Sequence, residues 1–173
     1  AGVAVEVFEA KPAFSTQGSG ISLQGNALRV LDALGAWDDI RAAGFPFEGL
    51  HLRAPGPGAP IVARLPDVKS GGPDYPAAMG MPRPDLARIL LTHAQRAGAT
   101  VHFGTKVTDL DAGAVDTVEL FVDGESAGVY DLIVGADGLH STVRDLIGIE
   151  TKPEAPGMGI WRTFVSRPTG AAV

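Results

Sequence analysis

The chain has 173 residues, and 14 lysine and arginine residues against 20 aspartate and glutamate residues give it a formal net charge of -6. That length excludes a miniature scaffold held together by disulfides or metals, and the absence of cysteine excludes a disulfide framework, a thiolate metal site and a cysteine nucleophile. The acidic balance disfavours nucleic-acid and anionic-membrane partners, and because no apolar stretch approaches a membrane span, we expect a cytoplasmic protein without integral membrane segments.

The first expected elements are one strand and two helices. Residues 3–9 form a mostly apolar, β-branched run, which is typical of a strand buried on both faces of a parallel sheet. Residues 26–35 predict a helix, with Leu28, Leu31 and Leu34 on one side and a glycine as its stop. A second, shorter helix is expected over 37–43.

A hairpin, a loop and a long helix follow. Two alternating stretches, 47–53 and 61–65, predict an antiparallel hairpin, because only a turn or loop tolerates the prolines and glycines between them. Residues 69–76 predict a loop. Pro84 then opens the clearest helix of the sequence, in which apolar residues recur at helical spacing until Gly98.

From Thr100 on, the pattern changes to short strands. They are expected over 101–103, 106–110, 117–122 and 129–134, with Asp123-Gly124 as a turn. A final helix is expected over 141–147 and a further strand over 157–166. Parallel and antiparallel strands mixed with helices indicate an α/β fold with a nucleotide-sized cleft.

Three early residues are candidates for ligand contact. Glu9 ends the first strand, where an acid can accept hydrogen bonds from ribose hydroxyls, although an exposed loop glutamate is the alternative. Gly20, in Gly18-Ser-Gly20, permits close backbone approach to a flat ligand, or belongs to an ordinary flexible loop. Arg83 precedes a helix and suits a pyrophosphate or another anion, or else pairs with Asp85 at the surface.

The segment from Asp131 to Arg144 is more specific. An apolar strand leads into Gly135-Ala-Asp137-Gly138, and a helix then presents Ser141 and Arg144. Asp137 is placed to hydrogen-bond ligand hydroxyls or to orient Arg144, whose guanidinium complements phosphate. An Asp-Gly pair alone is equally an ordinary turn.

The histidines and a C-terminal arginine are weaker candidates. The four histidines are scattered without ligand-like spacing, so no metal site is expected. His51 and Arg53 share a face of the expected hairpin and are candidates to line a substrate pocket. Arg162 is a candidate to meet an acidic substrate, whereas Trp161 and Phe164 are expected to pack a sheet.

The run from Asp131 to Arg144 closely resembles the "DG" fingerprint of the class A flavoprotein monooxygenases, FAD-dependent aromatic hydroxylases that include p-hydroxybenzoate, salicylate and 6-hydroxynicotinate hydroxylases. In chain order, 3–9 resembles the family's second strand, 18–35 the loop and helix beneath the flavin, and 82–91 its Arg-x-x-Leu-x-x-x-Leu helix. The resemblance covers nearly the whole chain. The preceding Gly-x-Gly-x-x-Gly fingerprint and the later Gly-Asp fingerprint are not in this sequence, so we expect the central part of an enzyme about twice as long.

The resemblance implies a fold and a set of cofactor residues. The fold is α/β, with a Rossmann-like FAD-binding domain that lacks its first strand and an inserted or adjoining antiparallel substrate-domain sheet. The FAD-binding parts are expected over 1–46 and 82–152, a substrate-domain hairpin over 47–81 and the start of the substrate sheet over 153–173. The residues implied in binding FAD are Glu9, Lys11, Gly20, Arg83, Val107, Asp137, Gly138 and Arg144.

The implied activity is hydroxylation of a small aromatic or heteroaromatic substrate by O2 through a flavin hydroperoxide, with NADPH or NADH as the co-substrate. The protein then supplies orientation and a dry pocket, and no side chain is expected to be catalytic. The alternatives are another flavin-dependent oxidoreductase of the same fold, such as an epoxidase, halogenase or reductase, and a truncated, non-catalytic nucleotide-binding fragment. A homodimer is one assembly that this activity allows.

Overall fold

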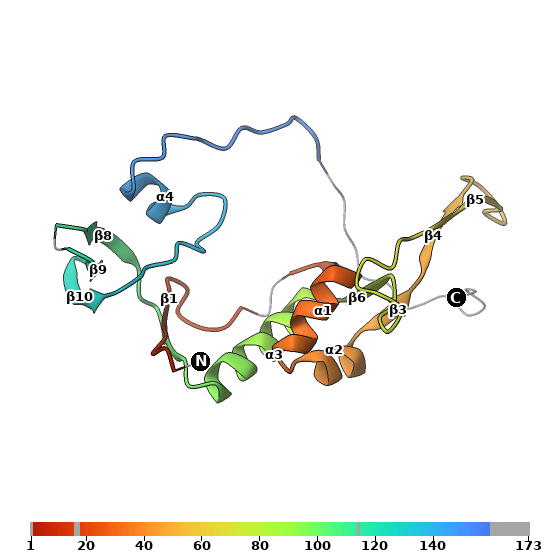
Figure 1. Cartoon of the computed structure of the whole chain (residues 1–173). Coiled ribbons are helices and arrows are strands. Elements are labelled where there is room, and N and C mark those ends of the chain that lie inside the picture. The colour runs from red at the N-terminus through yellow and green to blue at the C-terminus, as the bar shows by residue number, and fades with distance from the viewer. Residues whose placement is uncertain (1, 16–17, 114, 160–173) are drawn as a thin grey trace. The chain divides into compact units, whose positions relative to one another are not determined.

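A computed structural model describes residues 2–15, 18–113 and 115–159 of the chain (Figure 1). They form two compact units. One unit runs from Ser15 to Ala97, and the other combines the described residues up to Phe14 with those from Gly98 on. None of the helices in the described residues has both the length and the hydrophobicity that a membrane crossing requires.

A parallel strand pair opens the unit that contains the N-terminal residues. Strand β1 (Glu6–Glu9) pairs in parallel with β7 (Thr100–Phe103), so Glu9 lies opposite Phe103. The parallel strand expected over 3–9 is therefore confirmed over 6–9 only, and its expected burial on both faces is wrong. Val3 is 75% and Val5 46% exposed, because β7 is the single strand that pairs with β1 in the described part of the chain.

Three antiparallel strands and a short helix complete this unit. Strands β8 (Val107–Asp111), β9 (Val118–Val122) and β10 (Glu125–Tyr130) form a sheet, and α4 (Thr142–Leu146) follows. The Asp123-Gly124 turn joins β9 to β10 with φ values of 52° and 88°, as a tight hairpin turn requires.

The expected strand over 129–134 is wrong beyond Tyr130. Leu132 and Val134 are each 76% exposed, and among the described residues no strand pairs with this segment. Its apolar, β-branched composition favours extended backbone, but a strand also needs a hydrogen-bonded neighbour.

The other unit packs three helices against a small sheet. The helices α1 (Gly25–Ala33), α2 (Trp37–Ala43) and α3 (Arg83–Arg96) lie where the sequence predicts them. The sheet consists of β2 (Gly20–Gln24), β6 (Ala78–Pro82) and β3 (Phe45–Phe47), in the order β2-β6-β3. The sequence did not predict β2, β3 or β6 as separate strands.

The apolar core of this unit lies between the helices and the sheet. Its buried residues are Leu23, Leu28, Leu31, Ala36, Ile40, Met79, Met81, Leu86 and Ile89. Leu34, expected on the same helix face as Leu28 and Leu31, is 63% exposed instead, because α1 ends at Ala33 and the chain turns away through Gly35 at φ 77°.

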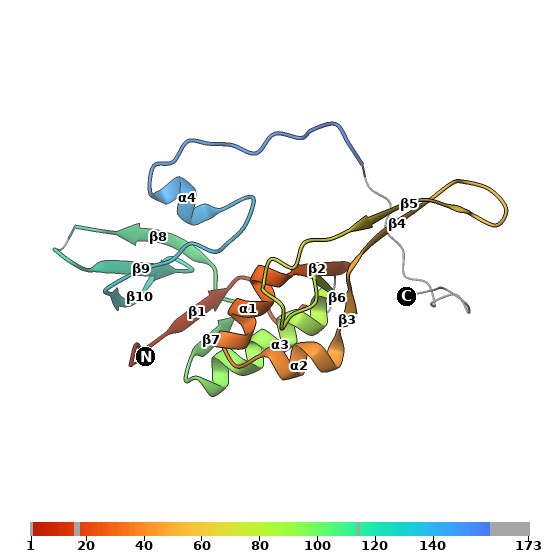
Figure 2. The same ribbon diagram turned by 45° about the vertical axis from the view of Figure 1, so that its right-hand side comes forward.

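The expected hairpin is present. Strands β4 (Gly49–Arg53) and β5 (Ile61–Pro66) pair antiparallel and form a long ribbon that extends away from the helices of its unit (Figure 2). The loop expected over 69–76 contains no helix or strand. The strand expected over 157–166 falls mostly outside the described residues, and the domain boundaries expected from the sequence stay predictions.

Candidate functional site

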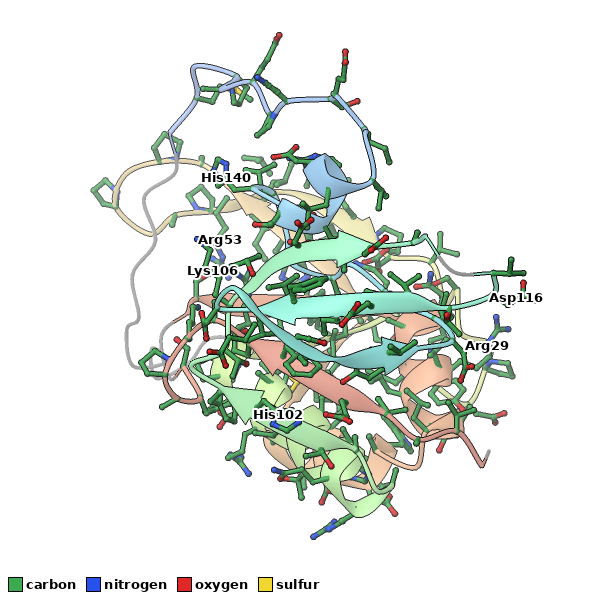
Figure 3. All side chains as sticks on the ribbon, turned by 90° about the vertical axis from the view of Figure 1, so that its left-hand side faces the viewer. Arg29, Arg53, His102, Lys106, Asp116 and His140 are labelled. Carbon is green, nitrogen blue, oxygen red and sulfur yellow. The ribbon has the colours of Figure 1, made fainter. Side chains whose placement is uncertain are left out.

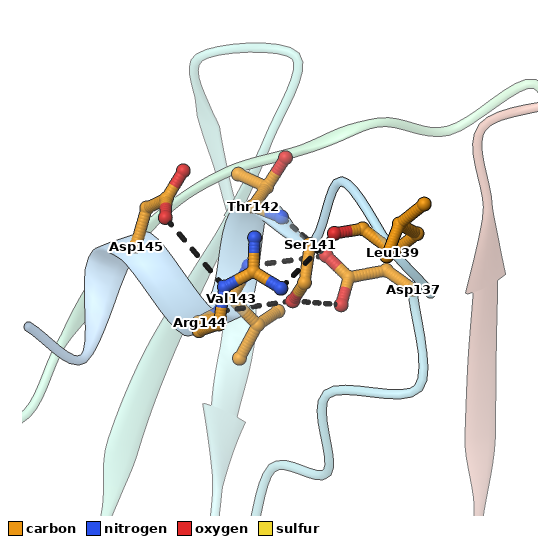
Figure 4. Close-up of polar contacts among 7 residues, drawn as sticks. All are labelled: Asp137, Leu139, Ser141, Thr142, Val143, Arg144 and Asp145. Atoms are coloured by element: carbon orange, nitrogen blue, oxygen red, sulfur yellow. Dashed lines mark hydrogen bonds and ion pairs between the residues drawn. The ribbon is translucent and has the colours of Figure 1, made fainter. Parts of the chain in front are cut away.

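Residues 135–144, a loop that runs into the first three residues of α4, are called the Asp137 loop below and are held together by their own hydrogen bonds (Figure 4). The hydroxyl of Ser141 donates to the carboxylate of Asp137, which also accepts the backbone N–H groups of Thr142 at 2.7 Å and Val143 at 3.0 Å. The Ser141 hydroxyl accepts the backbone N–H of Arg144 at 3.0 Å. Both side chains thus cap the first turn of α4, where backbone N–H groups lack partners within the helix.

The side chain of Arg144 holds the other side of the Asp137 loop. Its guanidinium donates to the carbonyl oxygen of Leu139 at 3.0 Å, and its Nε lies 3.9 Å from the carboxylate of Asp145. This Nε is buried and has no hydrogen-bond partner among the described residues. A buried donor without an acceptor costs free energy, and the nearest carboxylate, that of Asp145, lies beyond hydrogen-bond distance.

The two glycines of the loop serve different purposes. A Cβ at Gly135 would lie 2.7 Å from Cγ1 of Val143, so α4 can pack here only against a glycine. Gly138 has φ 85°, which other residues rarely adopt, and a Cβ there would meet no atom within 4 Å. The backbone at Gly138 therefore faces open space.

The hydrogen bonds around Asp137 also set its ionisation. Burial tends to raise the pKa of this carboxyl, but hydrogen bonds from the Ser141 hydroxyl and from the backbone N–H groups of Val143 and Thr142 act in the opposite direction and leave the pKa below its usual value of 3.8. Asp137 is therefore a carboxylate at neutral pH.

A pocket of about 580 Å³ adjoins the Asp137 loop. Its walls come from β8, β9, α4 and the segment before the loop, and most of its lining residues are apolar. The polar lining side chains are Asp131, Ser141 and Arg144.

A second group of candidate residues meets at the carboxyl ends of β1 and β7. The carboxylate of Glu9 accepts the backbone N–H of Lys11 at 2.8 Å through Oε1. The carbonyl oxygen of Glu9 accepts the N–H of Thr105 at 3.0 Å, and that of Lys11 accepts the N–H of Gly104 at 2.8 Å. The turns after the two strands are thus bound together, and Val107 begins β8 directly after them. Oε2 of Glu9 has no hydrogen bond within the described residues.

Gly20 and Arg83 lie together in the other unit. Gly20 pairs with Pro82 across β2 and β6, and the backbone N–H of Arg83 donates to the carbonyl oxygen of Ser19 at 3.0 Å. A Cβ at Gly18 would lie 3.4 Å from Cβ of Arg83, so the glycine-rich turn packs directly on the start of α3.

The guanidinium of Arg83 makes no ion pair or hydrogen bond with the described residues. The alternative in which it pairs with Asp85 is wrong, because Asp85 pairs with Arg88 one turn later, at 3.3 Å. No side chain caps the start of α3 either. A guanidinium without a partner among the described residues therefore stands at a helix start that no side chain caps.

The substrate candidates His51 and Arg53 are exposed on β4. His51 lies directly opposite Arg64 of β5, and Arg53 donates to the carbonyl oxygen of Ala59 at 2.9 Å. Arg64 was missed in the sequence, although the hairpin register identifies it once the turn length is known. Arg162 lies outside the described residues.

Two other histidines are held by carboxylates. Nε2 of His93 lies 2.8 Å from Asp39, and Nε2 of His102, on β7 in Figure 3, lies 2.8 Å from Glu6. In the part of the chain that the structure describes, no three histidine, aspartate or glutamate residues are grouped so that they could hold a metal ion.

Known proteins resemble this chain over most of its length. Residues 1–167 match the family described as FAD binding domain. The chain is 36% identical over 170 residues to 3-amino-4-hydroxybenzoate 2-monooxygenase of Streptomyces cremeus, covering 95% of this chain and 41% of that protein. It is 33% identical over 153 residues to 6-hydroxynicotinate 3-monooxygenase of Bordetella bronchiseptica, covering 87% of this chain and 39% of that protein.

This chain also resembles a solved structure in its fold. The tetrameric form of 2-methyl-3-hydroxypyridine-5-carboxylic acid oxygenase superimposes with a TM-score of 0.68 at 31% sequence identity, over 85% of this chain and 36% of that chain. This chain therefore spans less than half the length of the proteins it matches.

Proposed function

The chain belongs to the FAD binding domain family, and from that premise we propose that it is the cofactor-binding part of an FAD-dependent monooxygenase acting on a small aromatic substrate. The observation that carries the proposal is the free guanidinium of Arg83, which stands beside the glycine-rich turn at the uncapped start of α3. A planar cation and backbone N–H groups at one helix end suit the pyrophosphate or ribityl part of FAD.

The corner at the ends of β1 and β7 fits the adenosine part of FAD. Oε1 of Glu9 is held by the N–H of Lys11, which leaves Oε2 to accept hydrogen bonds from ribose hydroxyls. The ammonium group of Lys11 adds positive charge for a phosphate. The backbone of Val107, at the start of β8, is assigned to the adenine.

In the Asp137 loop we assign the ligand contacts to Gly138 and Arg144. The open backbone at Gly138 and the positive charge of the Arg144 guanidinium suit FAD and the passing nicotinamide nucleotide. Asp137 acts on both ligands through the shape of the loop, since its oxygens accept hydrogen bonds from Ser141, Thr142 and Val143.

When bound, FAD supplies the redox chemistry by which NADPH or NADH provides electrons and one oxygen atom of O2 passes to an aromatic ring. The residues of this chain bind and orient the cofactor, and none of them is assigned as a nucleophile or general base. His51, Arg53 and Arg162 remain the candidates for substrate contact. The names of the relatives, which act on an aminohydroxybenzoate and a hydroxynicotinate, favour an aromatic acid.

The expected homodimer and cytoplasmic location stay predictions. So do the domain boundaries. An epoxidase, halogenase or reductase shares the fold, so the reaction product decides between these activities.

The test uses the whole protein that contains this chain, loaded with FAD. It is incubated with NADPH or NADH and a panel of hydroxylated and aminated aromatic acids, and we expect O2 uptake together with a product one oxygen atom heavier by mass spectrometry. Reductant consumption without an oxygenated product from any acid, or an epoxidised, halogenated or reduced product, would overturn the proposal.

A further inference from the structure

A second pocket, called the Trp37 pocket below, lies in the unit of α1, α2 and α3, and residues of both α2 and β3 line it. It has a volume of about 370 Å³ and shares no lining residue with the candidates for FAD contact. A volume of this order is typical of pockets that hold a small organic molecule. Its lining residues are Trp37, Arg41, Pro46, Glu48, Lys69, Pro73, Asp74, Tyr75, Pro76 and Met79.

Aromatic and aliphatic side chains form part of the pocket lining. The rings of Trp37 and Tyr75 meet edge to face, with centroids 5.5 Å apart and an interplanar angle of 70°. The Tyr75 hydroxyl donates to the carboxylate of Asp32, which fixes the orientation of the ring. Met79 is 1% exposed and belongs to the apolar core beneath. These surfaces suit a flat ring, which aromatic side chains bind through edge and face contacts.

The cations at the pocket are available to a ligand. Arg41 lies one turn after Trp37 on α2 and binds Asp38 through a single nitrogen, Nη2, at 2.9 Å. Both of these side chains are exposed, so this ion pair is weak and the rest of the guanidinium fork remains open. Lys69 pairs with Glu48 at 3.3 Å, again between exposed groups. A carboxylate is the partner that this fork binds best.

One acceptor at the pocket is unused. Asp74 makes no ion pair or hydrogen bond with the described residues, whereas Glu48 forms the exposed ion pair with Lys69. An unpaired carboxylate that lines the same pocket as an open guanidinium favours a ligand with an acid and a hydrogen-bond donor.

We propose that the Trp37 pocket binds a small aromatic acid that carries an amino or hydroxyl group on its ring. The ring lies against Trp37 and Tyr75, the carboxylate binds Arg41, and the amino or hydroxyl group donates to Asp74. This is a binding site in addition to the flavin site and the substrate site proposed above, and it does not depend on either.

The test is calorimetric titration of the whole protein that contains this chain with 4-aminobenzoate. We expect saturable binding that Arg41→Gln weakens by at least about 10-fold, the range expected when a charged hydrogen bond is lost. Benzoate, which lacks the donor, and aniline, which lacks the acid, bind more weakly than 4-aminobenzoate.

The matched control is Arg88→Gln. Arg88 makes the same kind of ion pair with Asp85, three residues earlier on its own helix, at 3.3 Å, but does not line the pocket. Helix content and melting temperature are compared for both variants. The proposal is overturned if 4-aminobenzoate does not bind, if Arg41→Gln binds it as well as the unchanged chain, or if Arg88→Gln weakens it equally.

A further variant separates this proposal from the flavin assignment. Arg83→Ala is expected to reduce FAD retention and to leave the affinity for 4-aminobenzoate unchanged. A parallel loss of 4-aminobenzoate binding in Arg83→Ala would contradict the Trp37 pocket as a separate site.

Discussion

Ser141 donates a hydrogen bond from its hydroxyl to the carboxylate of Asp137, and Ser141 is the residue that accepts the backbone N–H of Arg144. Ser141 is also buried, with 8% of its surface exposed. Asp137 and Ser141 are thus joined to each other and to the first turn of α4. The Asp137 carboxylate therefore holds the turn and the start of α4 in a fixed arrangement.

Removing the Asp137 carboxylate, which caps the first turn of α4, should destabilise that helix. Asp137→Ala is expected to lower the free energy of unfolding by about 1 kcal/mol, the usual value of an N-cap, and to speed amide exchange at Thr142 and Val143. Asp145→Ala is the control, because its carboxylate is 70% exposed and lies 3.9 Å from Arg144. Equal exchange rates in the Asp137 and Asp145 variants would contradict the capping role.

The same cap should persist at mildly acidic pH. Because the pKa of Asp137 is lowered in the folded chain, its contribution to stability is present above the unfolded value of 3.8 and is lost as the pH falls through the lower folded value. Protection of the α4 amides should therefore be unchanged from pH 7 to about pH 5. Carboxyl NMR shifts of Asp137 report the titration directly, and a midpoint above 3.8 would contradict this result.

If Arg83 binds FAD as proposed, Arg83→Ala should weaken FAD binding by about 10- to 100-fold, the range expected for loss of a charged hydrogen bond. The fold should stay intact, since the Arg83 guanidinium makes no ion pair or hydrogen bond with the described residues. FAD retention after gel filtration measures the effect, with Arg88→Ala as the control. Retention equal to that of the control would remove Arg83 from the flavin site.

The contact between Gly25 and Gly71 should tolerate no side chain. A Cβ at Gly25 would lie 2.6 Å from the backbone nitrogen of Gly71, whereas a Cβ at Gly80 would meet no atom closer than 3.6 Å. Gly25→Ala should therefore destabilise the chain by about 1–3 kcal/mol, and Gly80→Ala by clearly less. Chemical denaturation of the two variants tests this, and equal midpoints would contradict the close backbone approach.

Tyr75 should titrate above the usual tyrosine value. The hydrogen bond to Asp32, then burial, then the charges of Asp32 and Asp74 raise its pKa above 10.0, although Arg29 acts in the opposite direction. Because the pKa of Tyr75 is raised in the folded chain, the neutral Tyr75 hydroxyl stabilises the fold fully below pH 10. This contribution is lost as the pH rises through the pKa of the folded chain.

Absorbance titration in a Tyr130→Phe background isolates Tyr75, since the chain contains two tyrosines. Asp32→Asn should move the Tyr75 midpoint back toward 10.0. A midpoint that does not respond to Asp32→Asn would contradict the hydrogen bond.

The sequence predicted the elements whose signals are local. Helices α1, α2 and α3 have apolar spacing and glycine stops, and the resemblance to FAD-dependent aromatic hydroxylases and the α/β fold are both confirmed. Strands β2 and β6 were missed because glycine is a poor strand former and each strand is defined only by its partner across a long separation in sequence. The segment 131–134 is the opposite case. Its composition favours a strand, but no strand among the described residues pairs with it.

The same limit applies to the site. Gly20 and Arg83 were each proposed separately, but only the pairing of β2 with β6 shows that they lie together. The capping bonds of Asp137 depend on side-chain rotamers, which no spacing in the sequence reveals. The Trp37 pocket depends on a loop that folds back onto α2, and loops carry little periodic signal.

The most direct test of the central claim is the flavin content of the whole protein that contains this chain. After incubation with FAD and gel filtration, we expect the visible absorption of a bound flavin at about one FAD per protein molecule, and a clear loss of it in Arg83→Ala. A protein that keeps its fold but elutes without flavin would contradict the account.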